Sequence, residues 1–140
     1  MPPDAKPDPS QRFRRTRAAH AEETAEDYVE AIAQLVERHG EARVKHLATL
    51  MGVSHVTVTR IVTRLQKEGL VTTEPRAPVE LTAAGKRMAL ASRRRHETVL
   101  AFLLAAGVPR RQAEIDAEGI EHHCSSATLR AMKKATDKLT

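Results

Sequence analysis

Six carboxylate and imidazole side chains occur at helical spacing in three separate stretches of the sequence. They are Asp27 and Glu30, then His96, and then Glu118, Glu121 and His122. Residues three or four apart lie on one face of a helix, so each stretch can present its polar groups together. Four carboxylates and two imidazoles would form an oxygen-rich site, which manganese, magnesium or high-spin iron prefers and zinc or copper does not. The residue types therefore predict a site for hard divalent cations.

Apolar neighbours predict that the second and third stretches face the core. His96 precedes Val99 by three residues and so lies along an apolar stripe. The triplet that ends at His122 shares its helical face with Ile115, which should direct it inward. Cys124 and His123 lie off that face, and we expect both to stay outside the site.

Each stretch also has an explanation that needs no metal. Asp27 can close a capping box with Thr24. A single buried histidine such as His96 is more often a hydrogen-bonded core residue than a ligand. Glu118 and Glu121 can form a solvated helix edge. The convergence of all three on core-facing positions favours metal, because buried carboxylates need partners and no arginine is evidently placed among them.

The elements that must position these residues are mostly helical. Residues 1–19 lack apolar periodicity and predict a disordered basic tail. Its four arginines could contact DNA phosphates, although a solubilising role is the simpler interpretation: Arg12, Arg14, Arg15 and Arg17. Periodicity, caps and glycines then predict helices over about 21–39, 44–51, 55–68, 82–106, 109–123 and 126–140, with short strands at 70–73 and 79–81.

This order predicts a mainly α protein with a winged helix-turn-helix over residues 20–90 and its two-stranded wing. An α-helical metal-binding and dimerisation domain should follow over residues 91–140. Two helices joined by a glycine turn and followed by a hairpin are typical of DNA-binding modules. A small helical bundle with a solvated cationic face is the alternative.

The second helix of that pair would present an acid-free face to DNA. Arg60 could bind a guanine edge in a fork, and Val56 could contact a thymine methyl group. Threonine hydroxyls and Lys67 suit phosphates. The predicted DNA contacts, with one at the wing tip, are His55, Val56, Thr57, Thr59, Arg60, Thr63, Arg64, Lys67 and Arg76.

Composition agrees with a DNA-binding protein of a reducing compartment. The 140-residue chain has a formal net charge of +5, which suits a polyanionic partner, and its single cysteine excludes an intramolecular disulfide framework. No apolar run reaches transmembrane length and the first residues lack the apolar centre of a secretory signal, so we expect a cytoplasmic location and no membrane partner.

Several motifs together resemble the manganese transport regulators of the diphtheria toxin repressor family, over about residues 22–140. They are Asp27-Tyr28-Val29-Glu30, Met51-Gly52-Val53-Ser54, Leu81-Thr82-Ala83-Ala84-Gly85, Arg95-His96-Glu97 and the run from Asp116 to His123. The resemblance implies a dimeric repressor of metal-uptake genes, activated by Mn²⁺ at a two-metal site formed by the six residues named first. Iron-sensing relatives have Met and Cys where this chain has Asp27 and Glu121, which favours manganese, with Fe²⁺, Co²⁺ or Zn²⁺ as possible substitutes.

The sequence thus predicts a manganese-responsive regulator that binds a palindromic operator as a homodimer, with no enzymatic activity and no small organic substrate. Two other classes stay open. A di-metal carboxylate enzyme would need Glu-x-x-His on two helices, whereas here the motif is found once beside a helix-turn-helix. A metal-independent DNA-binding protein would carry the same polar clusters for structural reasons. Dependence of DNA binding on metal separates the three.

Overall fold

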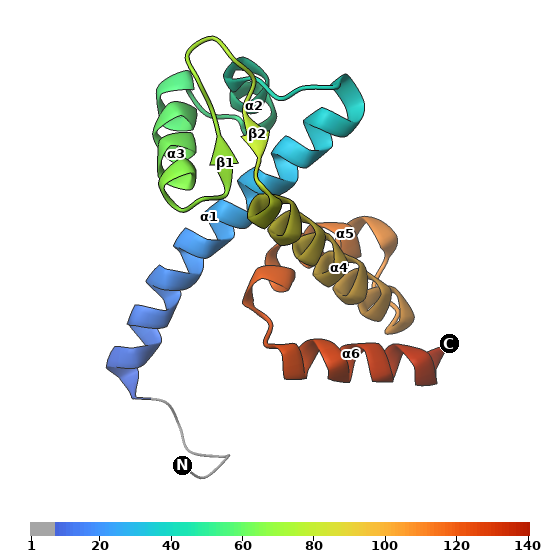
Figure 1. Cartoon of the computed structure of the whole chain (residues 1–140). Helices are drawn as coiled ribbons and strands as arrows, with labels where there is room; N and C mark the ends of the chain where they lie inside the picture. The colour runs from blue at the N-terminus through green and yellow to red at the C-terminus, as the bar shows by residue number, and fades with distance from the viewer. Residues whose placement is uncertain (1–7) are drawn as a thin grey trace.

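The computed structural model describes residues 8–140, of which residues 11–19 are described by their helical backbone alone. The elements in chain order are α1 (Pro9–His39), α2 (Val44–Met51), α3 (His55–Lys67), β1 (Val71–Thr72), β2 (Glu80–Leu81), α4 (Ala83–Ala105), α5 (Arg110–Ile120), the 3-10 turn η1 (Glu121–His123) and α6 (Ser126–Leu139). In Figure 1, α2, α3 and the hairpin form one group, α4, α5 and α6 form another, and α1 passes both. The mainly α, winged helix-turn-helix prediction is confirmed.

Helix α1 begins much earlier than the sequence predicted. Asp8 caps it by accepting a hydrogen bond from the backbone nitrogen of Ser10 at 3.1 Å, and Pro9 occupies the first turn, where its missing N–H costs nothing. The predicted disorder is therefore wrong from Pro9 onward. Residues 1–7 and the side chains of the four arginines lie outside the described part of the chain.

The early start also removes the capping box considered for Asp27. Thr24 lies inside α1 and its hydroxyl donates to the carbonyl of His20 at 3.0 Å. Apolar periodicity, which located the helix from about residue 21, appears only where α1 packs on the core, at residues such as Val29 and Ile32. Burial and helix formation therefore begin at different places along α1.

The helix-turn-helix forms as its glycine and serine predict. Gly52 ends α2 with a left-handed φ of 67°, and the hydroxyl of Ser54 accepts from the backbone nitrogen of Thr57 at 3.1 Å to start α3. Val58 and Leu65 of α3 are fully buried against the core. This packing leaves the opposite face of α3 free.

The wing is tied to the loop between α1 and α2. Its strands are antiparallel, with Thr72 opposite Glu80. The backbone nitrogen of Val79 donates to the carbonyl of Ala42 at 2.7 Å. At the tip, Arg43 donates to the carbonyl of Arg76 at 3.0 Å. The backbone at that tip has a φ of 66°, so the wing arginine is held in a tight turn.

Helix α4 leaves the wing without a linker. Thr82 caps it by accepting from the backbone nitrogen of Gly85 at 3.1 Å, and its own hydroxyl donates to the carbonyl of Gly69 at 2.6 Å. A β-carbon on Gly85 would lie only 2.1 Å from the carbonyl oxygen of Leu70. The helix then continues unbroken to Ala105, through the boundary expected at residue 90. No helix in the described residues is both long and apolar enough to cross a membrane.

We expect Gly85→Ala to destabilise the protein by about 1–3 kcal/mol, because the methyl group must displace a backbone carbonyl that cannot rotate away. Gly119→Ala is the matched control. It is also in a helix, but nothing in the described chain lies within 4 Å of the added β-carbon, so it should stabilise by about 0.5–1 kcal/mol. Urea unfolding in the presence of a chelator measures both, and equal effects would contradict the close packing of α4 on the wing.

Candidate metal centre

The three predicted stretches meet where α1, α4 and η1 come together. Glu121 has no exposed surface, and the side chain of His122 is 1% exposed. Asp27 and Glu30 approach from α1, and His96 approaches from α4. All three stretches contribute to one region of the structure, as the sequence predicted.

The inward direction expected for the third stretch is only partly right. Ile115 is 56% exposed and the side chain of Glu118 is 62% exposed, so this face of α5 does not enter the core of the chain described here. The α-helix ends at Ile120, and the tighter η1 turn that follows carries Glu121 and His122 inward instead. The sequence offered no signal for this change of helix type.

One group of potential ligands joins α4 to the end of α5. The Nδ1 atom of His96 lies 2.8 Å from Oε2 of Glu121 and 3.4 Å from Oε1 of Glu118. Potential ligand atoms of these three residues all lie within 4.8 Å of one another. We call this the α4 cluster.

A second group joins α1 to η1. Nε2 of His122 lies 2.9 Å from Oδ1 of Asp27, and Glu23 places a carboxylate oxygen within 4.8 Å of both. We call these three residues the α1 cluster. Oε1 of Glu121 lies 3.5 Å from Nε2 of His122, so the two clusters are neighbours. Glu23 is not among the six predicted ligands, although its i, i+4 spacing from Asp27 is a usable signal.

Among the six predicted ligands, three side-chain atoms are buried without a hydrogen bond in the described chain. They are Oε1 of Glu30, Nδ1 of His96 and Oε2 of Glu121. The last two lie close together, but their orientation does not satisfy hydrogen-bond geometry. Buried polar atoms are ordinarily paired, so a group of oxygen and nitrogen atoms left open in one place fits a cation as their common partner.

Glu26 is a buried carboxylate that sequence reasoning missed. It accepts a hydrogen bond from Nδ1 of His122 at 2.5 Å and pairs with Arg95 at 2.9 Å. This contradicts the expectation that no arginine is available inside. Because Nδ1 faces Glu26, the Nε2 atom of His122 is the one left to face the carboxylate of Asp27. Such a carboxylate partner fixes the orientation of metal-binding histidines.

Burial and mutual repulsion alter the proton affinity of two residues. Burial, and next the nearby charge of Glu30, raise the pKa of Glu121 to about 8. Hydrogen bonds to Asp27 and then to Glu26 raise the pKa of His122 to about 10. Both residues therefore hold protons near pH 7 in the metal-free protein, and these protons balance part of the negative charge that a cation would neutralise.

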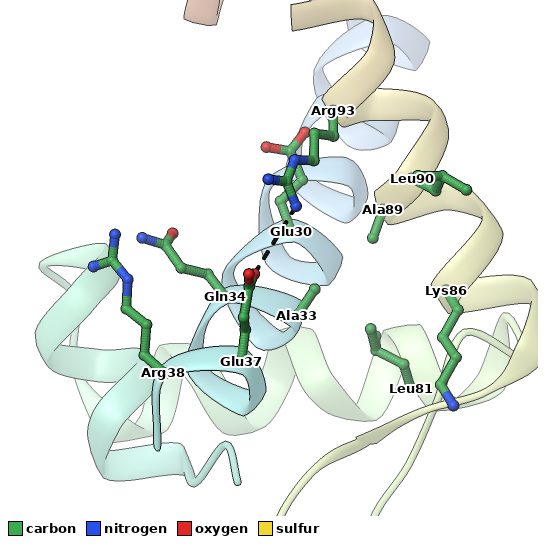
Figure 2. Close-up of a pocket in the computed structure, with 10 residues that line it drawn as sticks. All are labelled: Glu30, Ala33, Gln34, Glu37, Arg38, Leu81, Lys86, Ala89, Leu90 and Arg93. Carbon is green, nitrogen blue, oxygen red and sulfur yellow. Dashed lines mark ion pairs between the residues drawn. The ribbon is translucent and has the colours of Figure 1, made fainter. Parts of the chain in front are cut away.

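A groove between α1 and α4 reaches Glu30 from the surface (Figure 2). Its volume is about 540 Å³. Arg93 and Glu37 face each other across it at 3.9 Å. Glu30 thus lies between this groove and the buried ligand atoms, whereas the other predicted ligands do not line the groove.

Most of the residues predicted to contact DNA lie on the exposed surface. Seven of the nine predicted contacts are exposed: His55, Val56, Thr59, Arg60, Thr63, Lys67 and Arg76. Thr57 is half-buried in the helix cap. Arg64 is half-buried and donates to the carbonyl of Ala21 on α1 at 3.2 Å. Arg64 therefore links α3 to α1 and is less free to reach DNA than the others.

Two family models match successive parts of the chain. Residues 20–79 match the domain described as iron dependent repressor, N-terminal DNA binding domain, and residues 82–140 match iron dependent repressor, metal binding and dimerisation domain. The chain belongs to the iron-dependent repressor family. It therefore contains a DNA-binding domain followed by a metal-binding and dimerisation domain, and members of this family are transcriptional repressors.

Individual relatives within the iron-dependent repressor family carry a more specific name. Transcriptional regulator MntR of Escherichia coli O6:H1 (strain CFT073) is 45% identical over 126 residues, which make up 90% of this chain and 81% of the relative. HTH-type transcriptional regulator MntR of Bacillus subtilis (strain 168) is 38% identical over 100 residues, or 71% of this chain and 70% of the relative.

Solved structures of manganese-dependent regulators share the fold. The manganese regulator SloR superposes with a TM-score of 0.70 at 29% identity, over 81% of this chain and 53% of SloR. A manganese-dependent transcriptional repressor in complex with manganese gives a TM-score of 0.72 at 30% identity, over 81% of this chain and 52% of that protein. The chain spans about half the length of these two proteins.

We expect the metal-free protein to lose stability as the pH rises from about 5 to about 10. The folded state holds the protons of Glu121 and His122 more tightly than an unfolded chain, whose values are near 4.5 and 6.5. The stabilisation is therefore complete below the unfolded values and is lost as the pH passes the folded ones. Urea unfolding with chelator at pH 6 and pH 8.5 measures it. Glu121→Gln should flatten the change, and stability that rises over this range would contradict the assignment.

Proposed function

We propose that this chain is a manganese-responsive repressor that binds a palindromic operator as a homodimer when metal is bound. The observation that carries the proposal is the meeting of α1, α4 and η1 at buried oxygen and nitrogen atoms that lack hydrogen-bond partners. The names of the related regulators agree with it. We also propose that it represses metal-uptake genes, as the resemblance to the manganese transport regulators implies.

The proposed ligands of two divalent ions are the six residues Asp27, Glu30, His96, Glu118, Glu121 and His122. Their four carboxylates and two imidazoles contain no sulfur, and Cys124 is in neither cluster. Burial raises the pKa of the Cys124 thiol, which further disfavours the thiolate that softer metals prefer. Fe²⁺, Co²⁺ and Zn²⁺ bind most ligand sets more tightly than Mn²⁺ does, so selection of Mn²⁺ would rest on the hardness of the ligands.

The ligands lie on both halves of the protein, and this division provides the coupling. Asp27 and Glu30 lie on α1, which packs against α2 of the DNA-binding domain, whereas the other four lie on α4 and the α5–η1 segment. A bound cation would neutralise carboxylates from both halves and so hold α1 against α4 and η1. Without it, Glu121 keeps its proton, because burial and the nearby charges of Glu30 and Glu118 disfavour its ionised form, and it cannot act as a charged ligand that links α1 to α4 and η1.

Docking of α1 would in turn fix the position of α3. The hydrogen bond from Arg64 to the carbonyl of Ala21 connects the two helices directly. In a dimer, both recognition helices bind adjacent major grooves only when their separation matches the half-site spacing. Metal would act as an effector with a coupling free energy of about 1–3 kcal/mol.

We expect Mn²⁺ to strengthen operator binding by about 5–150-fold relative to chelator-treated protein, as measured by gel shift. Glu121→Gln should lose most of this increase. The amide resembles the protonated carboxyl group, so the variant should fold without metal, but it cannot become a charged ligand. Glu114→Gln, an exposed change of equal charge on α5, is the control. Operator affinity that is the same in Mn²⁺ and in strong chelator would overturn the sensor model and leave DNA binding intact.

We expect Arg60→Ala to cost about 1–3 kcal/mol in operator binding and to relax sequence preference at one position, because its exposed guanidinium can pair with a guanine edge. Lys67→Ala should weaken binding to all sequences alike and reduce its salt dependence. Competition gel shifts with operator variants separate the two effects. Unchanged preference in Arg60→Ala would show that another part of α3 reads the bases.

A further inference from the structure

We propose that Glu23 is an additional metal ligand, which extends the site by one turn toward the N-terminus of α1. This inference rests on the proposed metal-sensing function but concerns a residue outside the six ligands above. Glu23 precedes Asp27 by four residues, so the two carboxylates lie on the same face of α1. The proposed ion at this position would be held by Glu23, Asp27 and His122.

The geometry of the α1 cluster suits one ion. Its three residues place one carboxylate or imidazole atom each within 4.8 Å of one another, from two elements that lie about a hundred positions apart in the sequence. The imidazole of His122 is buried and its Nδ1 atom faces Glu26, so Nε2 is turned toward the two α1 carboxylates. Glu23 and Asp27 are half-buried and are accessible to an ion arriving from solvent.

An exposed ion pair is the competing explanation for the position of Glu23. Its Oε2 atom lies 3.1 Å from Nε2 of His123, whose side chain is exposed. Exposed pairs of this kind contribute little to stability, so this pair does not require a metal and does not prevent one. The two explanations differ in what removal of His123 should do, because a ligand role for Glu23 does not depend on it.

The position of Glu23 also bears on the DNA-binding half. Ala21, two residues earlier, accepts the hydrogen bond from Arg64 of α3. The turn of α1 that a ligand at Glu23 would hold is therefore the turn to which the recognition helix is attached. Loss of this ligand should weaken both metal binding and the response of DNA binding to metal.

The test is direct titration of the full chain with Mn²⁺, with free Mn²⁺ followed by electron paramagnetic resonance. We expect Glu23→Gln to weaken at least one bound ion by about tenfold or more, since even indirect partners of metal ligands cost about 10–100-fold. Glu22→Gln is the matched control, with the same charge change on an exposed neighbour. His123→Gln removes the ion pair, together with the edge contacts of the His123 ring on His20 and His122, and should leave Mn²⁺ affinity near that of the unaltered protein.

A second measurement reports coordination itself. The visible absorption bands of Co²⁺ bound to the protein should shift in Glu23→Gln and stay in place in Glu22→Gln. Equal Mn²⁺ affinity and equal spectra for these two variants would overturn the ligand role while the proposed function stands. The same conclusion follows if His123→Gln reproduces the loss seen in Glu23→Gln. Absence of Mn²⁺ binding by the unaltered protein would overturn both.

Discussion

The structure depends on how buried carboxylates are neutralised where α1, α4 and η1 meet. Glu26 is neutralised internally, because Arg95 and His122 both contact it. Glu121 also lies 3.5 Å from His122, but burial and the charge of Glu30 outweigh that cation and raise its pKa to about 8, so it holds a proton. The pairs of Glu26 with Arg95 and His122 join α1 to α4 and η1 without metal. At Glu121, a bound cation can replace the proton and so change the stability of the same junction. One carboxylate, Glu26, is thus neutralised by the protein itself, and its neighbour Glu121 is neutralised by a proton or, as proposed, by metal.

Local chemistry made much of the fold predictable from the sequence. Gly52 and Ser54 specify the turn and cap of the recognition helix, and Thr82 specifies the start of α4. The six proposed ligands were found because carboxylates and imidazoles at spacings of three and four are unusual on core-facing stripes. These inferences needed only neighbours within about one helical turn, which a single sequence shows directly.

Contacts between distant segments account for what was missed. Glu26 pairs with residues far along the chain, and its position beside Asp27 on α1 gave no sign of a partner on another helix. The change from α5 to a 3-10 turn at Glu121 leaves Ile115 exposed, although periodicity placed it inward. The early start of α1 was hidden because its first turns lack an apolar stripe, and helix formation there depends on the Asp8 cap.

The division of the proposed ligands across α1 and α4 has a consequence for exchanging the modules of this chain. The sequence boundary near residue 80 separates a DNA-reading unit from a sensing unit. The sensing unit, however, lacks the carboxylates of Asp27 and Glu30, because these belong to the reading unit. A chimaera that exchanges recognition modules at that boundary would therefore also exchange part of the metal specificity. If the proposed ligands hold the metal, operator preference and ion preference are exchanged together through α1.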